Sequence, residues 1–237
     1  MISSKSYSKI TESNFLYFLS IYVELSFDFI IINTIKNNTM SSNYFIQNQR
    51  NNVNHFNYYY FSSAFTLNEL SKIKEIGDKT SKQVAVVGGG EDGGVVSDYR
   101  KSEIGWIDEI PETEWLYSKI ADYANTANKE MWNFDIWGYH DALQYTTYYG
   151  DGGHYDWHAD LGPNISNRKL SCVLQLSDPG EYEGGELQMN TGGGVTSVKK
   201  ELGLICFFPS FVLHRVTPIT SGIRTSLVTW LCGANLR

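Results

Sequence analysis

The sequence predicts a mainly β domain, a sandwich or jelly roll with flanking helices. From Ala142 to Leu231 the chain divides into short segments, several of which alternate apolar and polar residues with period two, and turn residues separate them. Upstream of Ala142, two stretches show a helical period instead. The length of 237 residues suits one sizeable core and is short for two.

The first 60 residues differ in composition from the rest. They contain no Gly, Pro, Trp, Cys or Ala but ten Asn, whereas all 21 glycines lie at or after Gly77. Because a packed domain needs turn residues along its length, we expect a poorly ordered, low-complexity Asn-rich extension over 1–60 and a domain over 61–237. Translation from a later start at Met40 is the alternative.

The most apolar stretch, Phe15 to Ile32, does not have the character of a membrane anchor. Glu24 and Asp28 lie inside it, and each is costly at the centre of a bilayer. No small-residue cleavage site follows, so a signal peptide is also disfavoured. We therefore expect no membrane association.

The first predicted helix begins after Thr66. Thr66 and Glu69 form the pattern of a capping box, and Leu67, Leu70 and Ile73 share one face, with Gly77 as the predicted end. The second helix is predicted from Glu112, which follows Pro111, to about Trp132. Its expected buried stripe is Leu116, Ile120, Tyr123, Ala127 and Met131.

Between the helices, Gln83 to Asp98 reads as a strand, Val84 to Val87, followed by a glycine-rich loop. The run Gly88 to Gly90 lacks the Lys-Ser/Thr of a P-loop, so we do not interpret it as a phosphate site. The later strands are predicted in order, with Asp151-Gly152-Gly153 as the turn after the first. They are Leu143–Tyr149, Lys169–Leu176, Gly185–Met189, Leu202–Phe208, Val212–Thr217 and Arg224–Leu231.

Charge and cysteine content exclude some classes of function. The formal net charge is −7, and no basic face for a nucleic-acid backbone is visible. The three cysteines, Cys172, Cys206 and Cys232, are too few and too scattered for a disulfide framework. This odd number fits a reducing compartment, so we expect a cytoplasmic protein without a nucleic-acid partner.

The candidate metal ligands are His158, Asp160 and His214. Residues i and i+2 of a strand point to the same face, so the imidazole of His158 and the carboxylate of Asp160 can converge on one ion. His214 lies among apolar residues at the start of a later strand, where an imidazole needs a partner. Two histidines and one carboxylate form the facial triad of non-haem Fe(II) oxygenases, which leaves open positions on the metal.

Arg224 is the candidate ligand for an external anion. It opens the otherwise apolar strand Thr225–Leu231, and no acidic residue is adjacent to it in the sequence. A buried guanidinium needs an anion, and its planar fork suits a carboxylate. Ser226 and Tyr149 can each add a hydroxyl hydrogen bond. A keto diacid that chelates iron at one end and meets Arg224 at the other fits this arrangement.

These residues together resemble the 2-oxoglutarate- and Fe(II)-dependent dioxygenase superfamily, and within it the prolyl 4-hydroxylase-like, bacterial PKHD-type subgroup. The family pattern is a Tyr, His-x-Asp nine residues later, a distant His, a basic residue ten further on and a Trp at sixteen. These fall on Tyr149, His158-Ala159-Asp160, His214, Arg224 and Trp230. The resemblance is dense from about Gln144 to Leu231, and the segment Tyr182–Leu187 also matches the subgroup.

The resemblance implies a double-stranded β-helix (a cupin-like jelly roll) and an enzyme that couples oxidative decarboxylation of 2-oxoglutarate to hydroxylation. It implies iron on His158, Asp160 and His214, and 2-oxoglutarate on Arg224 and Tyr149, to which Ser226 is added from its place on the same strand face as Arg224. Tyr155 and Trp230 correspond to pocket residues near the co-substrate or substrate. The cofactors are Fe(II), 2-oxoglutarate and dioxygen, with ascorbate as an additional candidate. Collagen-type relatives usually carry Lys at the position of Arg224, so peptidyl-proline is not implied as the substrate.

The substrate is therefore an unidentified peptide, amino acid or other small molecule, and the oligomeric state is open. Two other functions remain open on the sequence. One is a non-catalytic jelly-roll module that senses a metal or ligand. The other is a Zn-dependent hydrolase, which needs a general base beside the metal and leaves Arg224 unexplained.

Overall fold

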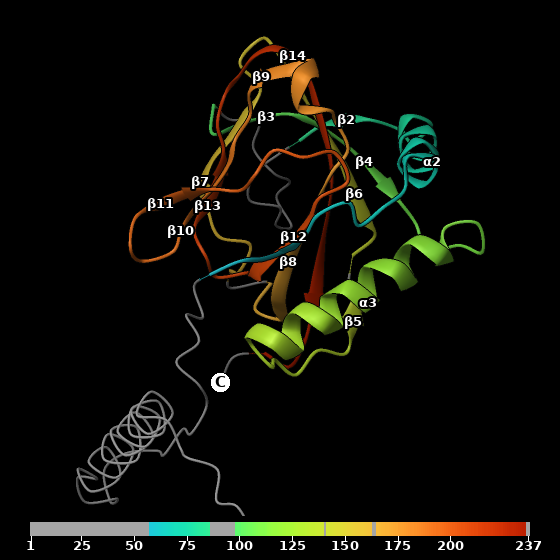
Figure 1. Ribbon diagram of the computed structural model, residues 1–237, viewed down its shortest axis with the longest axis vertical. Coiled ribbons are helices and arrows are strands. Elements are labelled where there is room, and N and C mark those ends of the chain that lie inside the picture. The colour runs from blue at the N-terminus through green and yellow to red at the C-terminus, as the bar shows by residue number, and fades with distance from the viewer. Residues whose placement is uncertain (1–56, 86–97, 140, 163–164, 236–237) are drawn as a thin grey trace, which may run out of the picture. The chain divides into compact units, whose positions relative to one another are not determined.

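Two antiparallel sheets face each other, and two helices cover the outer side of the larger sheet (Figure 1). The computed structural model describes residues 57–85, 98–139, 141–162 and 165–235. Within these residues the fold is mostly β, and it confirms the predicted jelly roll with flanking helices.

The larger sheet has the strand order β1-β12-β8-β14-β6-β4-β2 in the described residues, and β5 and β9 also pair with β14. The long strand β14 lies between β8 and β6, so it forms the middle of this sheet. Its strands are β1 (Tyr59–Phe61), β2 (Gln83–Val84), β4 (Glu103–Ile107), β5 (Gly138–Tyr139), β6 (Leu143–Tyr149), β8 (Arg168–Gln175), β9 (Tyr182–Gly184), β12 (Ile205–Pro209) and β14 (Ile219–Cys232).

The smaller sheet has the order β11-β10-β13-β7-β3. β10 and β11 are consecutive along the chain, whereas β3, β7 and β13 come from other parts of the sequence, and each pair is antiparallel. They are β3 (Arg100–Lys101), β7 (His154–His158), β10 (Leu187–Asn190), β11 (Val195–Ser197) and β13 (His214–Val216). A short 3-10 helix, η1 (Pro179–Glu181), precedes β9.

Alternation along the large sheet separates two cores. In β12, Ile205 and Phe207 join the cluster that contains the helices, whereas Cys206 and Phe208 join the cluster between the two sheets. All four side chains are fully buried. This period-two division follows from the strand geometry, which sends successive side chains to opposite faces. The face turned toward the smaller sheet also carries the candidate site.

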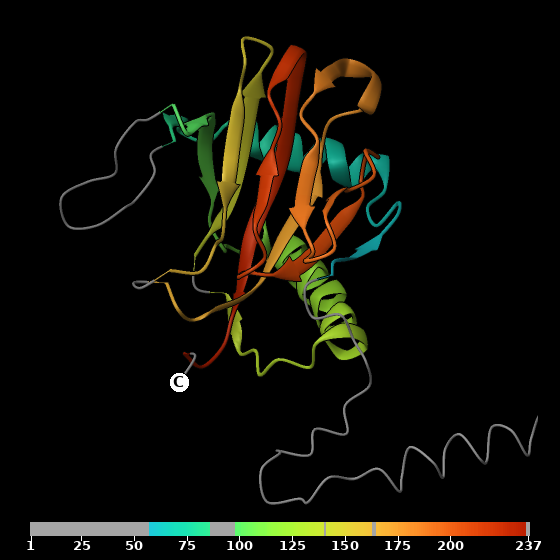
Figure 2. The same cartoon turned by 90° about the vertical axis from the view of Figure 1, so that its left-hand side faces the viewer.

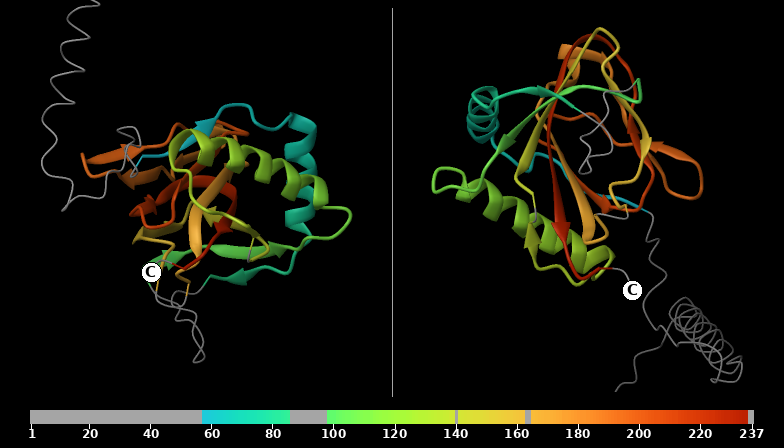
Figure 3. Two further views of the ribbon diagram at one scale, coloured as in Figure 1. Left: turned by 90° about the horizontal axis from the view of Figure 1, so that it is seen from below. Right: turned by 180° about the vertical axis from the view of Figure 1, so that it is seen from behind.

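The helices α2 (Leu67–Asp78) and α3 (Glu114–Met131) pack on the large sheet. Figure 2 shows both behind the strands, and the views in Figure 3 keep them on one side with β10, β11 and β13 on the other. The capping box of Thr66 and Glu69 is present as predicted. Of the predicted stripe of α3, Leu116, Ile120 and Ala127 are buried, and Tyr123 and Met131 are partly buried against the same cluster. The expected end at Gly77 is wrong, because the helix continues through Gly77 and its C-cap is Lys79.

Gly77 is present for a packing reason. A Cβ atom built at this position would lie 2.3 Å from the ring of Tyr145 in β6. The helix therefore approaches the sheet closely at this point, and only a residue without a side chain fits. A glycine near the end of a helix can thus mark a close contact between the helix and a neighbouring sheet instead of the end of the helix.

The remaining predictions concern the edges of the domain. The predicted strand Val84–Val87 is reduced to β2 in the described residues, and the glycine-rich loop lies outside them. The division into 1–60 and 61–237 stays a prediction, although β1 begins at Tyr59 and pairs with β12. Among the residues that the structure describes, no helix has the length and apolar character needed to cross a membrane. The stretch Phe15 to Ile32 lies outside them.

We predict that Gly77→Ala destabilises the fold, although alanine favours a helix by about 1 kcal/mol over glycine. The added methyl group collides with Tyr145, and overpacking of this kind costs about 1–3 kcal/mol. Urea unfolding followed by circular dichroism measures the difference. Ser71→Ala, at an exposed position of the same helix, serves as the control. A Gly77→Ala protein as stable as the wild type would contradict this explanation of the glycine.

Candidate metal centre

The first imidazole of the site, His158, is the last residue of β7. Its Nδ1 lies 2.7 Å from the backbone carbonyl oxygen of Asp156. A carbonyl oxygen can only accept, so Nδ1 carries the proton and donates it. This bond fixes the orientation of the ring and leaves the lone pair of Nε2 for a metal.

His214 repeats this arrangement from the neighbouring strand. It opens β13, and its Nδ1 lies 3.0 Å from the carbonyl oxygen of Val212. His214 is the direct register partner of His158 in the antiparallel pair β7–β13. The two ring centroids are 4.1 Å apart. Both rings therefore present Nε2 from adjacent positions on the same face.

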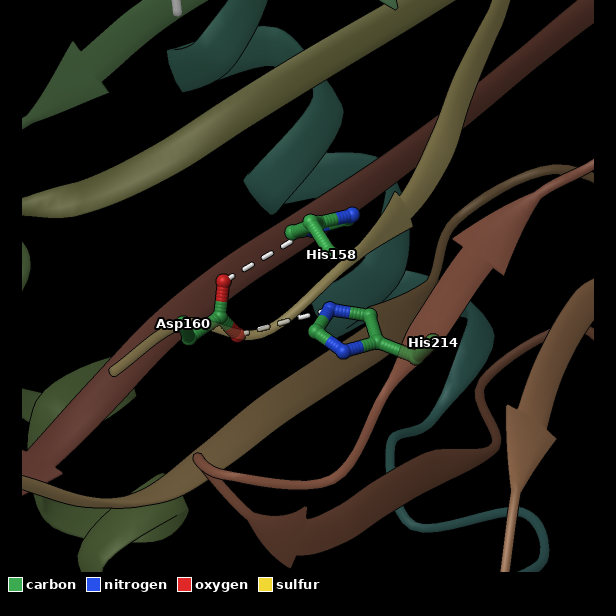
Figure 4. A group of neighbouring side chains, drawn as sticks. All are labelled: His158, Asp160 and His214. Atoms are coloured by element: carbon green, nitrogen blue, oxygen red, sulfur yellow. Dashed lines mark ion pairs between the residues drawn. The ribbon is translucent and has the colours of Figure 1, made fainter. Parts of the chain in front are cut away.

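Asp160 completes the group, as Figure 4 shows. Its Oδ1 is 3.7 Å from Nε2 of His158, and its Oδ2 is 3.5 Å from Nε2 of His214. One ligand atom from each of the three residues lies within 4.8 Å of the others. The residue follows β7, and its backbone N–H donates to the carbonyl of Ser210. The hydroxyl of Ser171 in β8 donates to Oδ2 at 2.6 Å.

The protonation states of these groups suit a divalent cation. Burial, together with the nearby His214, lowers the pKa of His158 to about 4, although Asp160 opposes this shift. Burial acts to raise the pKa of Asp160, but the two imidazoles and the Ser171 hydroxyl outweigh it and hold this pKa below its usual value. At neutral pH His158 is therefore a neutral imidazole and Asp160 a carboxylate, so neither group has to lose a proton when a metal binds. This donor set fits Fe(II).

A cavity of about 400 Å³ opens beside the three ligands. Strand β14 contributes its alternate residues Arg224, Ser226, Val228 and Trp230 to the lining, as predicted from the period of two. Arg224 is only 2% exposed, and its Nη1 donates to Ser226 Oγ at 3.3 Å. Within the described residues no carboxylate pairs with Arg224, so the guanidinium is available for an external anion.

Tyr149 does not line this cavity, which contradicts the prediction that its phenol binds the carboxylate of 2-oxoglutarate together with Arg224. Its hydroxyl donates to Glu103 at 2.7 Å, and this bond, with burial, raises the pKa of Tyr149 to about 12. The neighbouring Tyr148 lines the cavity instead and is the register partner of Arg224. Adjacent strand residues face opposite ways, so the motif spacing was one residue out.

The two predicted pocket residues both line the cavity. The ring of Tyr155 stacks on His158 with 3.5 Å between centroids, and Trp230 lies against the guanidinium of Arg168 at 3.6 Å. Arg168 is neutralised by Asp141 at 2.7 Å. Tyr155, in the smaller sheet, thus covers one side of the metal site. Trp230, in β14 of the larger sheet, forms part of the cavity wall on the other side.

Sequence reasoning missed three residues at the site, namely Tyr148, Ser171 and Arg100. Strand parity could have found the first two: Tyr148 shares a face with Gln144, and Ser171 shares one with Val173. Arg100 lies in β3, a two-residue strand without a periodic signal. It could not have been assigned from the sequence pattern.

Comparison with known proteins identifies what the site resembles. Residues 143–232 match the family model of the 2OG-Fe(II) oxygenase superfamily. PKHD-type hydroxylases from Teredinibacter turnerae and Colwellia psychrerythraea are each 40% identical to this chain, over 89 and 82 residues. Each match covers 35% of this chain, but only 39% and 37% of the respective relative. These matches confirm the family resemblance over the region that holds the site.

Solved structures resemble the fold over a longer part of the chain. A prolyl-4-hydroxylase from Pseudomonas putida has 20% identity and a TM-score of 0.59, and the match covers 75% of this chain and 93% of that one. A prolyl hydroxylase from Trichoplax adhaerens, solved with a hypoxia inducible factor peptide fragment, has 18% identity and a TM-score of 0.58, with 74% and 83% covered. These likenesses concern the fold and agree with the two-sheet arrangement described above.

We predict that Asp160→Asn abolishes Mn(II) binding, because the amide removes the only negative charge among the three ligands. Ser171→Ala should weaken binding roughly 10–100-fold, the usual effect of losing a hydrogen bond that orients a metal ligand. Electron paramagnetic resonance of free Mn(II) measures both affinities.

Ser177→Ala is the control, since Ser177 is buried as well but bonds to the backbone of Ile223 and Thr225. Equal losses in the two serine variants would show that Ser171 acts only through the fold.

Proposed function

We propose, from the match of residues 143–232 to the 2OG-Fe(II) oxygenase superfamily, that this chain is a 2-oxoglutarate-dependent Fe(II) dioxygenase that hydroxylates a peptide, an amino acid or another small molecule. The observation that carries the proposal is the buried Arg224 in the same cavity as His158, Asp160 and His214. A metal site alone does not explain a buried cation without a carboxylate partner.

The three ligands would hold Fe(II), and Arg224 with Ser226 would bind the far carboxylate of 2-oxoglutarate. Tyr148 replaces Tyr149 as the candidate phenol near this carboxylate, since the guanidinium of Arg224 lies over its ring at 5.4 Å. When bound, the iron, 2-oxoglutarate and dioxygen supply oxidative decarboxylation and the transfer of one oxygen atom to a C–H bond of the substrate. The chain positions the reactants and excludes water from around them.

The zinc hydrolase is less well supported. Such an enzyme needs a general base beside the metal, but Asp160 is the only carboxylate among the described residues that line the cavity. The sensor hypothesis shares the same ligands and is separated from the enzyme only by turnover. The prolyl hydroxylase from Trichoplax adhaerens, which has a similar fold, was solved with a peptide fragment, and this supports a peptide as one candidate substrate.

Two further parts of the proposal rest on weaker support. The three cysteines are buried, and their odd number does not suit a disulfide framework, which supports a reducing, cytoplasmic location. Ascorbate is proposed only as a reductant that keeps the iron in the ferrous state. No nucleic-acid partner is proposed, in view of the net charge of −7.

The proposal is tested with Fe(II) and 2-oxoglutarate under argon, followed by oxygen. The complex should show a weak visible charge-transfer band, and oxygen should produce succinate. Arg224→Ala should bind the metal normally but need roughly 30-fold or more 2-oxoglutarate, since truncation of one partner of a buried charge pair costs about 2–5 kcal/mol. A band without succinate over a broad substrate panel would favour the sensor, and no band in folded, metal-bound protein would refute the assignment.

The glycine pair of Tyr182–Leu187 gives a second test of Arg224. Gly185 has a φ of +62°, and a Cβ atom there would lie 2.9 Å from Cδ of Arg224. Gly185→Ala should therefore displace the guanidinium and weaken 2-oxoglutarate binding, by roughly tenfold if the displacement costs about 1.4 kcal/mol. Metal affinity should stay unchanged.

Calorimetric titration of the Mn(II)-loaded protein with 2-oxoglutarate measures this effect. Gly193→Ala is the matched control, because an added Cβ at Gly193 meets no atom within 4 Å. An unaltered 2-oxoglutarate affinity in Gly185→Ala would argue against the placement of the co-substrate on Arg224.

A further inference from the structure

We infer that Arg100 binds a carboxylate of the primary substrate, so that the substrate of this site is an acid. The inference deepens the proposed function and rests on it. Arg100 belongs to β3 at the edge of the smaller sheet, and its side chain lines the same cavity as the three metal ligands. It is the second arginine in this cavity that has no acidic partner in the described residues.

The described groups that bond to the guanidinium of Arg100 are polar but uncharged. Its Nε donates to Ser102 Oγ at 2.9 Å, and its Nη2 donates to Gln144 Oε1 at 3.0 Å. The guanidinium lies 4.5 Å from the centre of the Tyr155 ring. The residue is only 8% exposed. These contacts orient the guanidinium, but they use two of its five N–H donors and leave its charge uncompensated.

The other arginines of the cavity have their charges accounted for. Arg168 forms an ion pair with Asp141. In the proposed complex, the charges of Fe(II) and Arg224 are balanced by Asp160 and the two carboxylates of 2-oxoglutarate. In that complex, the positive charge of Arg100 has no negative charge to balance it. A desolvated cation is costly without an anion, so the loaded cavity is suited to one more negative charge.

The position of Arg100 indicates where that charge lies. Arg100 is stacked on Tyr155, and Tyr155 is stacked on His158. An anion on Arg100 is therefore separated from a metal ligand by only one aromatic ring. The C–H bond to be oxidised should accordingly lie close to the carboxylate within the substrate molecule. The cavity of about 400 Å³ must also hold 2-oxoglutarate. The acid is accordingly small, either a free amino acid or the C-terminal or acidic residue of a peptide.

A carboxylate suits this arginine better than a neutral carbonyl oxygen. The planar guanidinium can form two parallel hydrogen bonds to a carboxylate, and charge-assisted bonds are roughly twice as strong as neutral ones. The alternative is that Arg100 serves only as a structural link between β3 and Gln144 of β6. That role predicts no preference between an acid and the corresponding amide.

The test uses the protein loaded with Mn(II) and 2-oxoglutarate under argon. A panel of N-acetyl amino acids, including N-acetyl-proline, is titrated by calorimetry beside the matched N-acetyl amino-acid amides. N-acetyl-aspartate amide and N-acetyl-glutamate amide, which keep only a side-chain carboxylate, distinguish a C-terminal from an acidic-residue source. At least one acid should bind about tenfold or more tightly than its neutral amide.

Three variants assign the preference to Arg100. Arg100→Gln should lose it, and Arg100→Lys should keep part of it, because the charge remains without the planar fork. Lys101→Gln removes a unit charge from the next residue of β3, whose side chain pairs with Asp151 at 2.9 Å, and it should keep the full preference.

The inference is overturned if no acid in the panel binds better than its amide, whether both bind or neither does. It is also overturned if the preference survives in Arg100→Gln. The wild-type comparison needs no variant, so it decides even if Arg100→Gln fails to fold. Failure of the wild type to take up Mn(II) and 2-oxoglutarate in the loading step would instead refute the proposed function.

Discussion

The site depends on the register between β7 and β13. This antiparallel pair sets His158 directly opposite His214, and a slip of one residue would send one imidazole to the other face of the sheet. The backbone carbonyls of Asp156 and Val212 then fix both rings through Nδ1. The core between the sheets, built around Met189 and Phe208, holds the two strands against the larger sheet. Metal geometry is thus a consequence of strand pairing.

Charge is the second constraint on the cavity. Its described lining contains three arginines and one carboxylate, which is an expensive composition for a buried surface. The larger sheet contributes Arg224, which is proposed to hold the far carboxylate of 2-oxoglutarate, and the smaller sheet contributes Arg100 beside Tyr155. On this proposal, opposite walls of one cavity carry separate groups for two anions. This separation suits a reaction in which a co-substrate and a substrate are held at the same time without exchanging places.

The sequence predicted the parts of the fold and site that follow from local rules. Alternation in Arg224–Leu231 identified the cavity face of β14, and the pattern of Thr66 and Glu69 identified the start of α2. It failed where tertiary contacts decide. Tyr149 fitted the motif spacing, but its face of β6 is the one turned away from the cavity, where it meets Glu103. Gly77 resembled a helix terminator but is required by the ring of Tyr145. No sequence pattern marked Arg100, because its place at the site depends on contacts with residues distant in the sequence. These are Tyr155 and Gln144, the latter 44 residues away.

The account is tested most directly by a crystal structure of the protein with Mn(II) and 2-oxoglutarate, grown without oxygen. We predict one metal ion bound by Nε2 of both histidines and by a carboxylate oxygen of Asp160. The keto-acid end of 2-oxoglutarate should lie on this ion and its far carboxylate on Arg224, with Tyr148 beside it. Metal bound elsewhere, or the far carboxylate seated on Arg100 with Arg224 unoccupied, would contradict the account.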